Sequence, residues 1–570
     1  MMELALPAEF RPNEFPAASR EQWRELVDAV LRKSGASYES LVTRTYDGIE
    51  LQPLYTLDDA LPPYALAPAK QGWDVRQRHA VPDPVALMND LEGGVTSLWL
   101  ALPASSLERV LDGVYLDLAP IVLDGDVEAA RTMLRIYDQA PLLPSQVSGN
   151  LALTPFGEAL DVIKQAQQFP ELRTVVVDAL PFHDAGGSDS EELGASLALA
   201  VSYLRALTDA GLGVSEAFAQ LEFRYAATAD QFMTIAKLRA ARRLWARVAE
   251  VSGVDVPQVQ HAVTSSAMMT RRDPWVNMLR TTVATLAAGL GGADSVTVQP
   301  FDAAIGLPDE FARRIARNTQ NLLLEESHLG EVIDPAAGSW YVESLTDSLA
   351  SHAWSWFQEI ERAGGFSAAR SLVASRIAET WAARSARLAD RSDPITGVSE
   401  FPNLTEKPVV REPAPEVPSG DLPRVRYAQA FEELRDLADA QPERPQVFLA
   451  TLGPVAAHTA RATFAANLFN AGGFATPNAG PTKTAEDVAE KFKASGAKVA
   501  VLCGSDTSYA DQAVATVEAL RNAGAERVLL AGKKSEATVD GYVYTGCPAL
   551  EILNNTFEFL AIKESKGVER

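Results

Sequence analysis

Two histidines stand where proteins with parallel sheets bind their ligands. The first, His458, follows the loop 451–457, which comes directly after the predicted strand 447–450. Ligands of open parallel sheets lie beyond the carboxyl ends of the strands, so this imidazole is the polar side chain of interest in the loop. The glycine-containing loops 504–507 and 532–534 follow the next predicted strands. They would let a ligand approach the backbone closely, and plain turns are the alternative.

The second histidine, His261, opens the run H-A-V-T-S-S ahead of the predicted helix 275–288. Asp273 as N-cap and Pro274 as first helical residue are expected to start that helix. This order places His261 near the carboxyl end of a strand, where barrels keep their chemistry. Its imidazole can either donate a hydrogen bond to a ligand's carbonyl oxygen or be a satisfied interior side chain.

A third candidate is a group of arginines on the predicted helix 309–327. The inner side of this helix is expected to carry Phe311, Ile315, Leu322 and Leu323. The guanidinium groups could bind phosphate, or they could pair with carboxylates on a solvated helix face. The group consists of Arg313, Arg314 and Arg317.

These candidates must be positioned by α/β elements, because short β-branched runs alternate with helical stretches along most of the chain. Over residues 41–390 this alternation predicts a β/α barrel, with an open doubly wound sheet as the rival. Residues 1–40 predict an arm without a core of its own. Residues 391–440 are rich in proline and predict an extended linker with a lead-in helix. Residues 441–570 repeat strand–helix pairs typical of a flavodoxin-like parallel sheet.

The charge balance narrows the possible partners. The 570 residues include 51 Lys+Arg and 75 Asp+Glu, a net charge of −24. Such an acidic surface repels nucleic-acid phosphates and anionic lipids. Neither nucleic acid nor a membrane is therefore expected as a partner. No apolar stretch approaches the roughly 20 residues of a membrane helix and no signal-peptide pattern is seen, which predicts a cytoplasmic protein. Cys503 and Cys547 are predicted to be buried thiols. P-loop and dinucleotide-binding motifs are absent from the sequence.

Several stretches in the middle of the chain resemble motifs of the methylmalonyl-CoA mutase family. The likeness spans residues 41–365, and the unit after the linker takes the place of the family's cobalamin-binding domain. The resemblance implies an adenosylcobalamin enzyme in which CoA threads a split β/α barrel, cobalamin lies between the barrel and the C-terminal domain, and a radical reaction interconverts succinyl-CoA and methylmalonyl-CoA. The matching stretches, in the family's order, are 232–246, 273–277, 312–320, 325–327 and 334–341.

The same resemblance implies a cobalt ligand, the histidine of a D-x-H-x-x-G motif, and His458 is its match. Ala456 stands in place of the aspartate and Arg461 in place of the glycine. A ligating histidine needs a carboxylate that fixes its tautomer, and a long cation obstructs the approach of the corrin and its tail. The family's S-x-L and G-G motifs are also weakened, to 504–506 and 531–532. We therefore expect no cobalamin and no metal on this chain, with His458 as the one candidate ligand.

The sequence also differs from the family's motifs at the barrel positions where the resemblance implies an active site. Arg78 stands where the family's R-x-W-T-I-R-Q-Y-A-G motif has its tyrosine. His261 matches the histidine of H-C-Q-T-S-G, but Val263 and Ser266 replace the glutamine and glycine. His183 replaces the glutamine of Y-H-x-Q-E-A-G-A. A radical enzyme must exclude water and hold its substrate closely, so we expect no catalytic residue here and regard Arg78, His183 and His261 as vestigial matches.

The chain keeps family motifs along the barrel but lacks the family's residues at reactive positions. In this it resembles the small subunit of heterodimeric bacterial mutases, which keeps both folds without the chemistry. The hypothesis is a non-catalytic subunit that binds a large catalytic subunit through its arm and barrel. Adenosylcobalamin and the CoA thioester would then belong to the complex, with the cofactor on the large subunit. Two alternatives stay open. One is a self-sufficient adenosylcobalamin-dependent acyl-CoA mutase that uses His458 for cobalt and His261 for the thioester carbonyl, and the other is a regulatory CoA-binding barrel protein.

Overall fold

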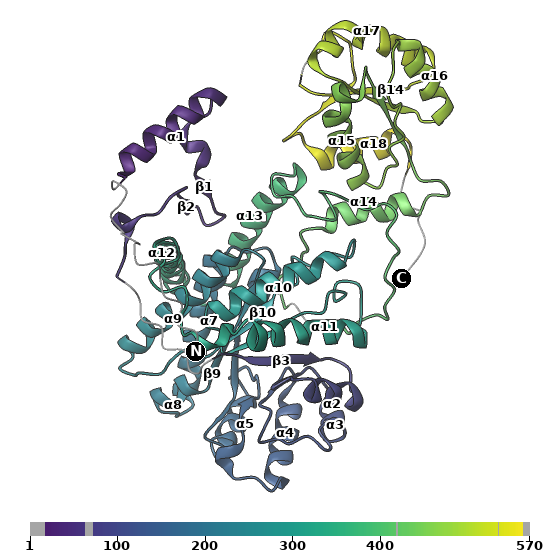
Figure 1. The fold of residues 1–570 in the computed structure, drawn as a ribbon. Coiled ribbons are helices and arrows are strands. Elements are labelled where there is room, and N and C mark those ends of the chain that lie inside the picture. The colour runs from purple at the N-terminus through teal and green to yellow at the C-terminus, as the bar shows by residue number, and fades with distance from the viewer. Residues whose placement is uncertain (1–17, 63–71, 418–419, 534, 563–570) are drawn as a thin grey trace, which may run out of the picture.

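The fold consists of two parallel sheets, each covered by helices (Figure 1). The computed structural model describes residues 18–62, 72–417, 420–533 and 535–562. Nine strands form the larger sheet and four form the smaller one, which belongs to the C-terminal unit at the top of the view. A hairpin of β1 (Thr43–Arg44) and β2 (Glu50–Leu51) precedes both sheets. The predicted class, a β/α barrel followed by a flavodoxin-like α/β domain, is confirmed.

The larger sheet closes on itself as a barrel. Its strand order is β7-β6-β5-β4-β3-β11-β10-β9-β8. The two end members, β7 (Leu172–Arg173) and β8 (Val175–Asp178), are pieces of one strand separated only by Thr174, so the order returns to its starting point. The other strands are β3 (Asp74–His79), β4 (Ser97–Leu100), β5 (Ile121–Leu123), β6 (Gly149–Asn150), β9 (Leu221–Ala227), β10 (Gln260–Thr264) and β11 (Ser295–Thr297).

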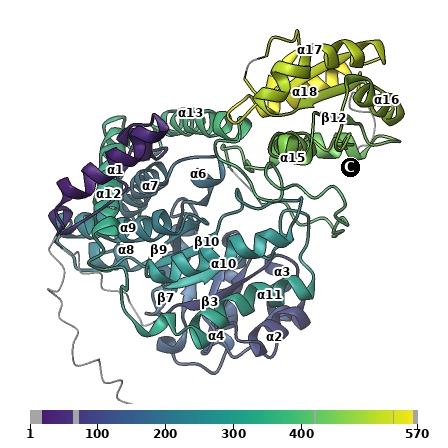
Figure 2. The ribbon, with the colours of Figure 1, turned by 45° about the horizontal axis from the view of Figure 1, so that its top comes forward.

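Helices surround this barrel and cover its apolar outer side (Figure 2). Because strand side chains alternate between faces, Leu98 and Leu100 of β4 join the main core while Trp99 faces the interior. The helices are α2 (Pro84–Glu92), α3 (Ala104–Val110), α4 (Val127–Gln139), α5 (Ala159–Ala166), α6 (Leu180–Asp184), α7 (Asp189–Asp209), α8 (Val214–Ala219), α9 (Gln231–Val251), α10 (Trp275–Leu290), α11 (Glu310–Asn321), α12 (Trp340–Arg362) and α13 (Arg370–Ala389).

One predicted helix start is wrong in detail. Helix α10 begins at Trp275, but its N-cap is Pro274. Asp273 lies one residue earlier in the left-handed region, with φ of 46°, and its side chain does not cap the helix. Its backbone N–H donates instead to the Glu406 carboxylate of the linker at 2.7 Å. The contact with the linker therefore sets the geometry of this turn.

The segment between α13 and α14 (Gln429–Asp439) crosses the carboxyl ends of several barrel strands. Backbone hydrogen bonds attach it at three places: Leu307 N–H to Glu412 O at 2.7 Å, Val425 N–H to Asp184 O at 2.8 Å and Tyr427 N–H to Ala267 O at 2.9 Å. The described part of this linker is thus bound to the barrel along its length.

The C-terminal sheet has the order β12-β13-β14-β15 and is parallel throughout. Two parallel bridges, Gln446 with Ala475 and Leu449 with Asn478, add the segment after α15 beside β12. The chain order of the sheet is therefore 2-1-3-4-5, the flavodoxin arrangement. Its elements are β12 (Val447–Thr451), α15 (Val455–Ala471), α16 (Ala485–Ser495), β13 (Val499–Cys503), α17 (Asp506–Asn522), β14 (Arg527–Ala531), β15 (Gly541–Val543) and α18 (Ala549–Phe559).

Candidate functional site

His261 lies on the inner face of β10 with both ring nitrogens engaged. Its Nε2 is 2.8 Å from the Thr297 hydroxyl, and its Nδ1 accepts a hydrogen bond from Arg224 Nε at 3.3 Å. Because Nδ1 accepts, Nε2 carries the proton and donates to Thr297. Burial and the nearby Arg76 and Arg224 hold the pKa of His261 well below its ordinary value. This geometry favours the satisfied interior histidine over one that donates to a ligand.

Large side chains fill the barrel around this histidine. The Arg224 guanidinium lies 4.1 Å from the centre of the Trp99 ring, and Arg78 lies over the same ring at 5.1 Å. The Trp99 ring meets His261 edge-on, with centroids 5.3 Å apart. Arg224 pairs with Asp178 at 2.9 Å. The barrel interior is thus packed with an indole and guanidinium groups.

Closer to the amino ends of the strands, a buried ion pair joins two strands that are not neighbours in the barrel. Arg76 of β3 pairs with Glu222 of β9, and the side chains of both residues are 6% exposed or less. Arg76 Nε also donates to Ser97 Oγ at 3.0 Å, and Asn150 Nδ2 lies 3.4 Å from Glu222. Both charges are paired and hydrogen-bonded, which is the condition for keeping ions in an interior.

His183 forms a contact that resembles part of a serine hydrolase triad. Its Nε2 is 2.6 Å from Ser265 Oγ, but its Nδ1 is 3.9 Å from the Glu192 carboxylate, too far for a hydrogen bond. Ser265 is only 1% exposed. A nucleophile needs access to its substrate, so this arrangement serves packing and not acyl transfer.

The titration of His183 gives a test of this burial. Burial and the neighbouring Lys237 lower the pKa of His183 to about 3, against about 6.5 in an unfolded chain. Between pH 6 and 4 only the unfolded state gains this proton, so stability falls with falling pH by about 1.4 kcal/mol per pH unit. We expect His183→Gln to flatten the pH dependence of the urea-unfolding free energy by that amount. An unchanged slope would contradict the burial, and the exposed His352, changed to Gln, is the control.

Two of the three arginines of α11 pair with a carboxylate from α2, while Arg314 lies over the Phe311 ring at 5.6 Å from its centre. Arg317 Nη1 lies 2.6 Å from Asp90, and Arg313 Nε lies 4.0 Å from the same carboxylate. Of the four side chains expected on the inner side of this helix, Ile315 and Leu323 are half-buried, and Leu323 packs against the main core. The prediction is wrong for Phe311 and Leu322. Both are exposed. The pairing favours a salt-bridged helix over a phosphate site.

In the C-terminal domain, His458 lies in the first turn of α15 and is buried. It shares the buried side of the helix with Ala462 and Ala465, and its Nδ1 has no hydrogen-bond partner. A metal-ligating histidine ordinarily uses its second ring nitrogen to donate to a carboxylate or carbonyl. His458 has neither such support nor an exposed face.

Arg461 occupies the carboxyl edge of the same sheet. Its Nη1 donates to Gly504 O at 2.7 Å, its Nη2 pairs with Asp506, and its guanidinium lies 4.8 Å from the Tyr509 ring centre. The Tyr509 hydroxyl donates to Ala531 O at 2.7 Å and accepts from Gly504 N–H at 3.1 Å. A Cβ added to Gly532 would meet the Arg461 guanidinium carbon at 3.7 Å. These side chains fill the edge where three sequence motifs have weakened.

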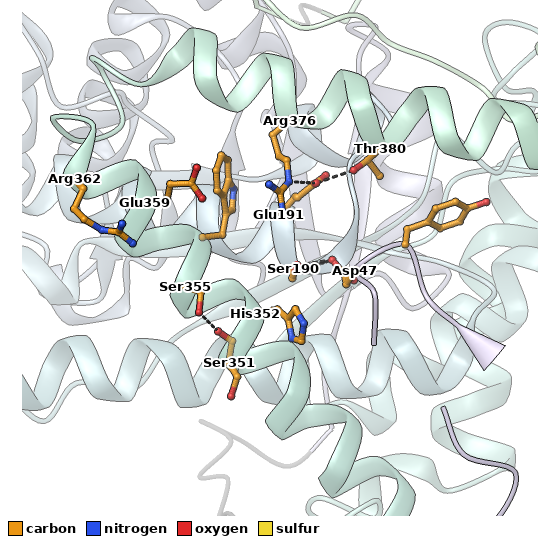
Figure 3. Close-up of a pocket in the computed structure, with 12 residues that line it drawn as sticks. Asp47, Ser190, Glu191, Ser351, His352, Ser355, Glu359, Arg362, Arg376 and Thr380 are labelled. Atoms are coloured by element: carbon orange, nitrogen blue, oxygen red, sulfur yellow. Dashed lines mark hydrogen bonds and ion pairs between the residues drawn. The ribbon is translucent and has the colours of Figure 1, made fainter. Parts of the chain in front are cut away.

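A surface pocket of about 400 Å³ lies beside α7, α12 and α13 (Figure 3). Its charged centre is Glu191, which accepts from Thr380 Oγ1 at 2.7 Å and from Arg376 Nε at 3.3 Å. Asp47 accepts from Ser190. Two of the carboxylates in this pocket, Glu191 and Asp47, are thus already bound by donors of the protein.

Three further observations concern membrane-spanning helices, metal sites and the cysteines. Among the described residues no helix is long and apolar enough to span a membrane, and no group of three or more His, Cys, Asp and Glu side chains is arranged to hold a metal. Both cysteines are free and buried, as predicted.

Comparisons with known proteins agree with this architecture. The profile of the family described as methylmalonyl-CoA mutase matches residues 151–468. The methylmalonyl-CoA mutase small subunit of Streptomyces virginiae is 56% identical, covering 96% of this chain and 98% of its own. That of Propionibacterium freudenreichii subsp. shermanii is 37% identical, covering 96% of both chains. The methylmalonyl-CoA mutase of Escherichia coli is 29% identical over 67% of this chain and 64% of its own. The barrel, the second α/β domain and these similarities together show that the chain belongs to the methylmalonyl-CoA mutase family, among its small subunits.

Proposed function

We propose that this chain is the non-catalytic small subunit of a heterodimeric, cytoplasmic methylmalonyl-CoA mutase. The large subunit would bind adenosylcobalamin and the CoA thioester and interconvert succinyl-CoA and methylmalonyl-CoA. This chain would contribute the arm of residues 1–40, the barrel of 41–390, the linker of 391–440 and the cobalamin-type domain of 441–570. It would support the assembly without chemistry of its own.

The observation that carries the proposal is the filled carboxyl edge of the C-terminal sheet. The residues there do not fit a corrin, because His458 is buried without a carboxylate partner and Arg461 lies across the loops that would receive the tail. The barrel supports the same conclusion. Trp99, Arg224 and Arg78 take up the space that the family's substrate would need.

The partner surface that we propose begins with α1 (Arg20–Ser34). None of its residues is buried, although Trp23, Leu26, Val27, Val30 and Leu31 recur at helical spacing. In both views α1 lies at the periphery of the barrel domain (Figures 1 and 2). An unburied apolar stripe of this kind fits a helix that is completed by another subunit.

Activity of the assembled complex tests this proposal. We expect His458→Ala in this chain to leave isomerase turnover and the adenosylcobalamin requirement of the complex unchanged, because the cofactor would be held by the large subunit. The exposed His352, changed to Ala, controls for the substitution itself. A loss of turnover on the order of 10-fold or more, the loss typical when a supporting or ligating group of a metal site is removed, would contradict the proposal.

A further inference from the structure

A second pocket, larger than the surface pocket beside α7, α12 and α13, shares Tyr46 and Asp47 with it and is also lined by His183. Its volume is about 980 Å³, and its walls come from the β1–β2 hairpin, the starts of α7 and α9, and from α10, α13 and the linker. The barrel-filling residues Trp99, Arg224 and His261 do not line it. Met233, Met268 and Leu279 do, and they give it an apolar surface with room for a small organic ligand.

The carboxylates around this cavity all have donors within the protein. Asp189 pairs with Lys237 at 2.9 Å, and Asp393 pairs with Arg387 at 2.7 Å. Asp47 accepts from Ser190 N–H at 3.2 Å, and Asp230 caps α9. Each of these carboxylates therefore already has a hydrogen-bond or ion-pair donor other than Arg384.

Arg384 lies near Asp189 and Asp393, and its charge helps to lower the pKa of both carboxyls, but it is hydrogen-bonded to neither. Among the described residues it makes no hydrogen bond or ion pair, and its Nε is buried and unsatisfied. Its guanidinium carbon lies 4.0 Å from the Tyr46 ring centre and 5.1 Å from that of Tyr427. Arg280, the other lining arginine without an ion pair, already donates to the neutral oxygens of Thr270, Asn277 and Thr396.

The Tyr46 and Tyr427 rings attract the charge of Arg384 without accepting hydrogen bonds from it, so its N–H donors stay free for a ligand. These donors match the two oxygens of a carboxylate, which they can bind in a bidentate manner. An apolar wall next to a guanidinium that has no hydrogen-bonded carboxylate favours an amphipathic ligand with a single anionic head. We propose that this cavity binds aliphatic carboxylates, with the carboxylate on Arg384 and the chain along Met233, Met268 and Leu279.

Calorimetric titration of the full-length chain with butanoate, hexanoate, octanoate and decanoate tests the proposal. We expect saturable 1:1 binding that tightens by about three- to fourfold per added methylene, the value for burying a CH₂ group. Octan-1-ol, which has the chain without the charge, is expected to bind at least about 10-fold more weakly than octanoate, because a charge-assisted hydrogen bond is lost.

Two variants locate the site. Arg384→Gln is expected to weaken octanoate binding by about 10-fold or more, while Arg370→Gln, at an exposed position of the same helix, leaves it unchanged. Leu279→Ser, at an exposed position in the cavity wall, is expected to reduce the dependence on chain length without unfolding the chain. The proposal is overturned if no carboxylate binds saturably, if octan-1-ol binds as tightly as octanoate, or if Arg384→Gln and Arg370→Gln behave alike.

Discussion

Aspartate at both Leu26 and Val30 is expected to weaken the complex with the large subunit by about 100-fold or more. These side chains are 70% and 64% exposed on α1, and burying each one in an interface would contribute about 1.5–3 kcal/mol. The variant removes that contribution from two neighbouring turns and also places charges against apolar surface. Binding of the full-length chains, measured by surface plasmon resonance, checks the prediction.

Leu118→Asp is the matched control for the arm. Leu118 is 73% exposed in the segment between α3 and β5, so its replacement changes the surface charge without touching α1. Its affinity for the large subunit is expected to equal that of the wild type. If the double variant on α1 also bound with wild-type affinity, the helix would not be part of the interface.

A second large effect is expected at Lys237, whose side chain is fully buried in α9. Its Nζ lies 2.6 Å from Glu192 and 2.9 Å from Asp189, and it thereby ties α9 to α7. Burial raises the pKa of Glu192 to about 7 even with this cation beside it. Lys237→Met should lower the free energy of unfolding by about 3–5 kcal/mol, because it leaves buried carboxylates unpaired. Urea unfolding at pH 7.5 measures the loss.

Two further variants separate the missing charge from the lost side chain. Adding Glu192→Gln to Lys237→Met should recover part of the stability, since one uncompensated carboxylate is removed. Arg243→Met on the same helix breaks an ion pair with Asp347 whose two side chains are both 41% exposed, and it should cost about 1 kcal/mol or less. Equal losses for Lys237→Met and Arg243→Met would refute the special role of the buried pair.

Much of the fold could be predicted from local patterns. The run 173–177 holds Thr174 and three valines, a composition typical of a strand, and β7 and β8 cover it apart from Thr174. The C-terminal strands and helices follow the same logic, because each strand is a short apolar run between turn residues. Closure of the barrel and the addition of 475–478 beside β12 depend on pairings between distant segments, which periodicity does not specify.

The contents of the candidate site were harder to predict. Arg461 was expected to obstruct the sheet edge, and it lies there, but the contributions of Tyr509 and of the buried Lys237 were missed. The alternation in L-E-F-R-Y at 221–225 offered a usable signal, because Glu222 and Arg224 share one face of a buried strand. The partner of each charge across the barrel depends on the register of the strands, which the alternation does not specify. Only the structure therefore shows that Glu222 pairs with Arg76 and Arg224 with Asp178.

The claim that this chain does not bind the cofactor can be tested most directly by visible spectroscopy. The purified full-length chain is titrated with adenosylcobalamin, and the absorption spectrum is followed to several equivalents. We predict the spectrum of the free cofactor throughout, with no saturable change. A stoichiometric base-off, histidine-ligated spectrum that disappears in His458→Ala would contradict the account and would assign the cobalt ligand to this subunit.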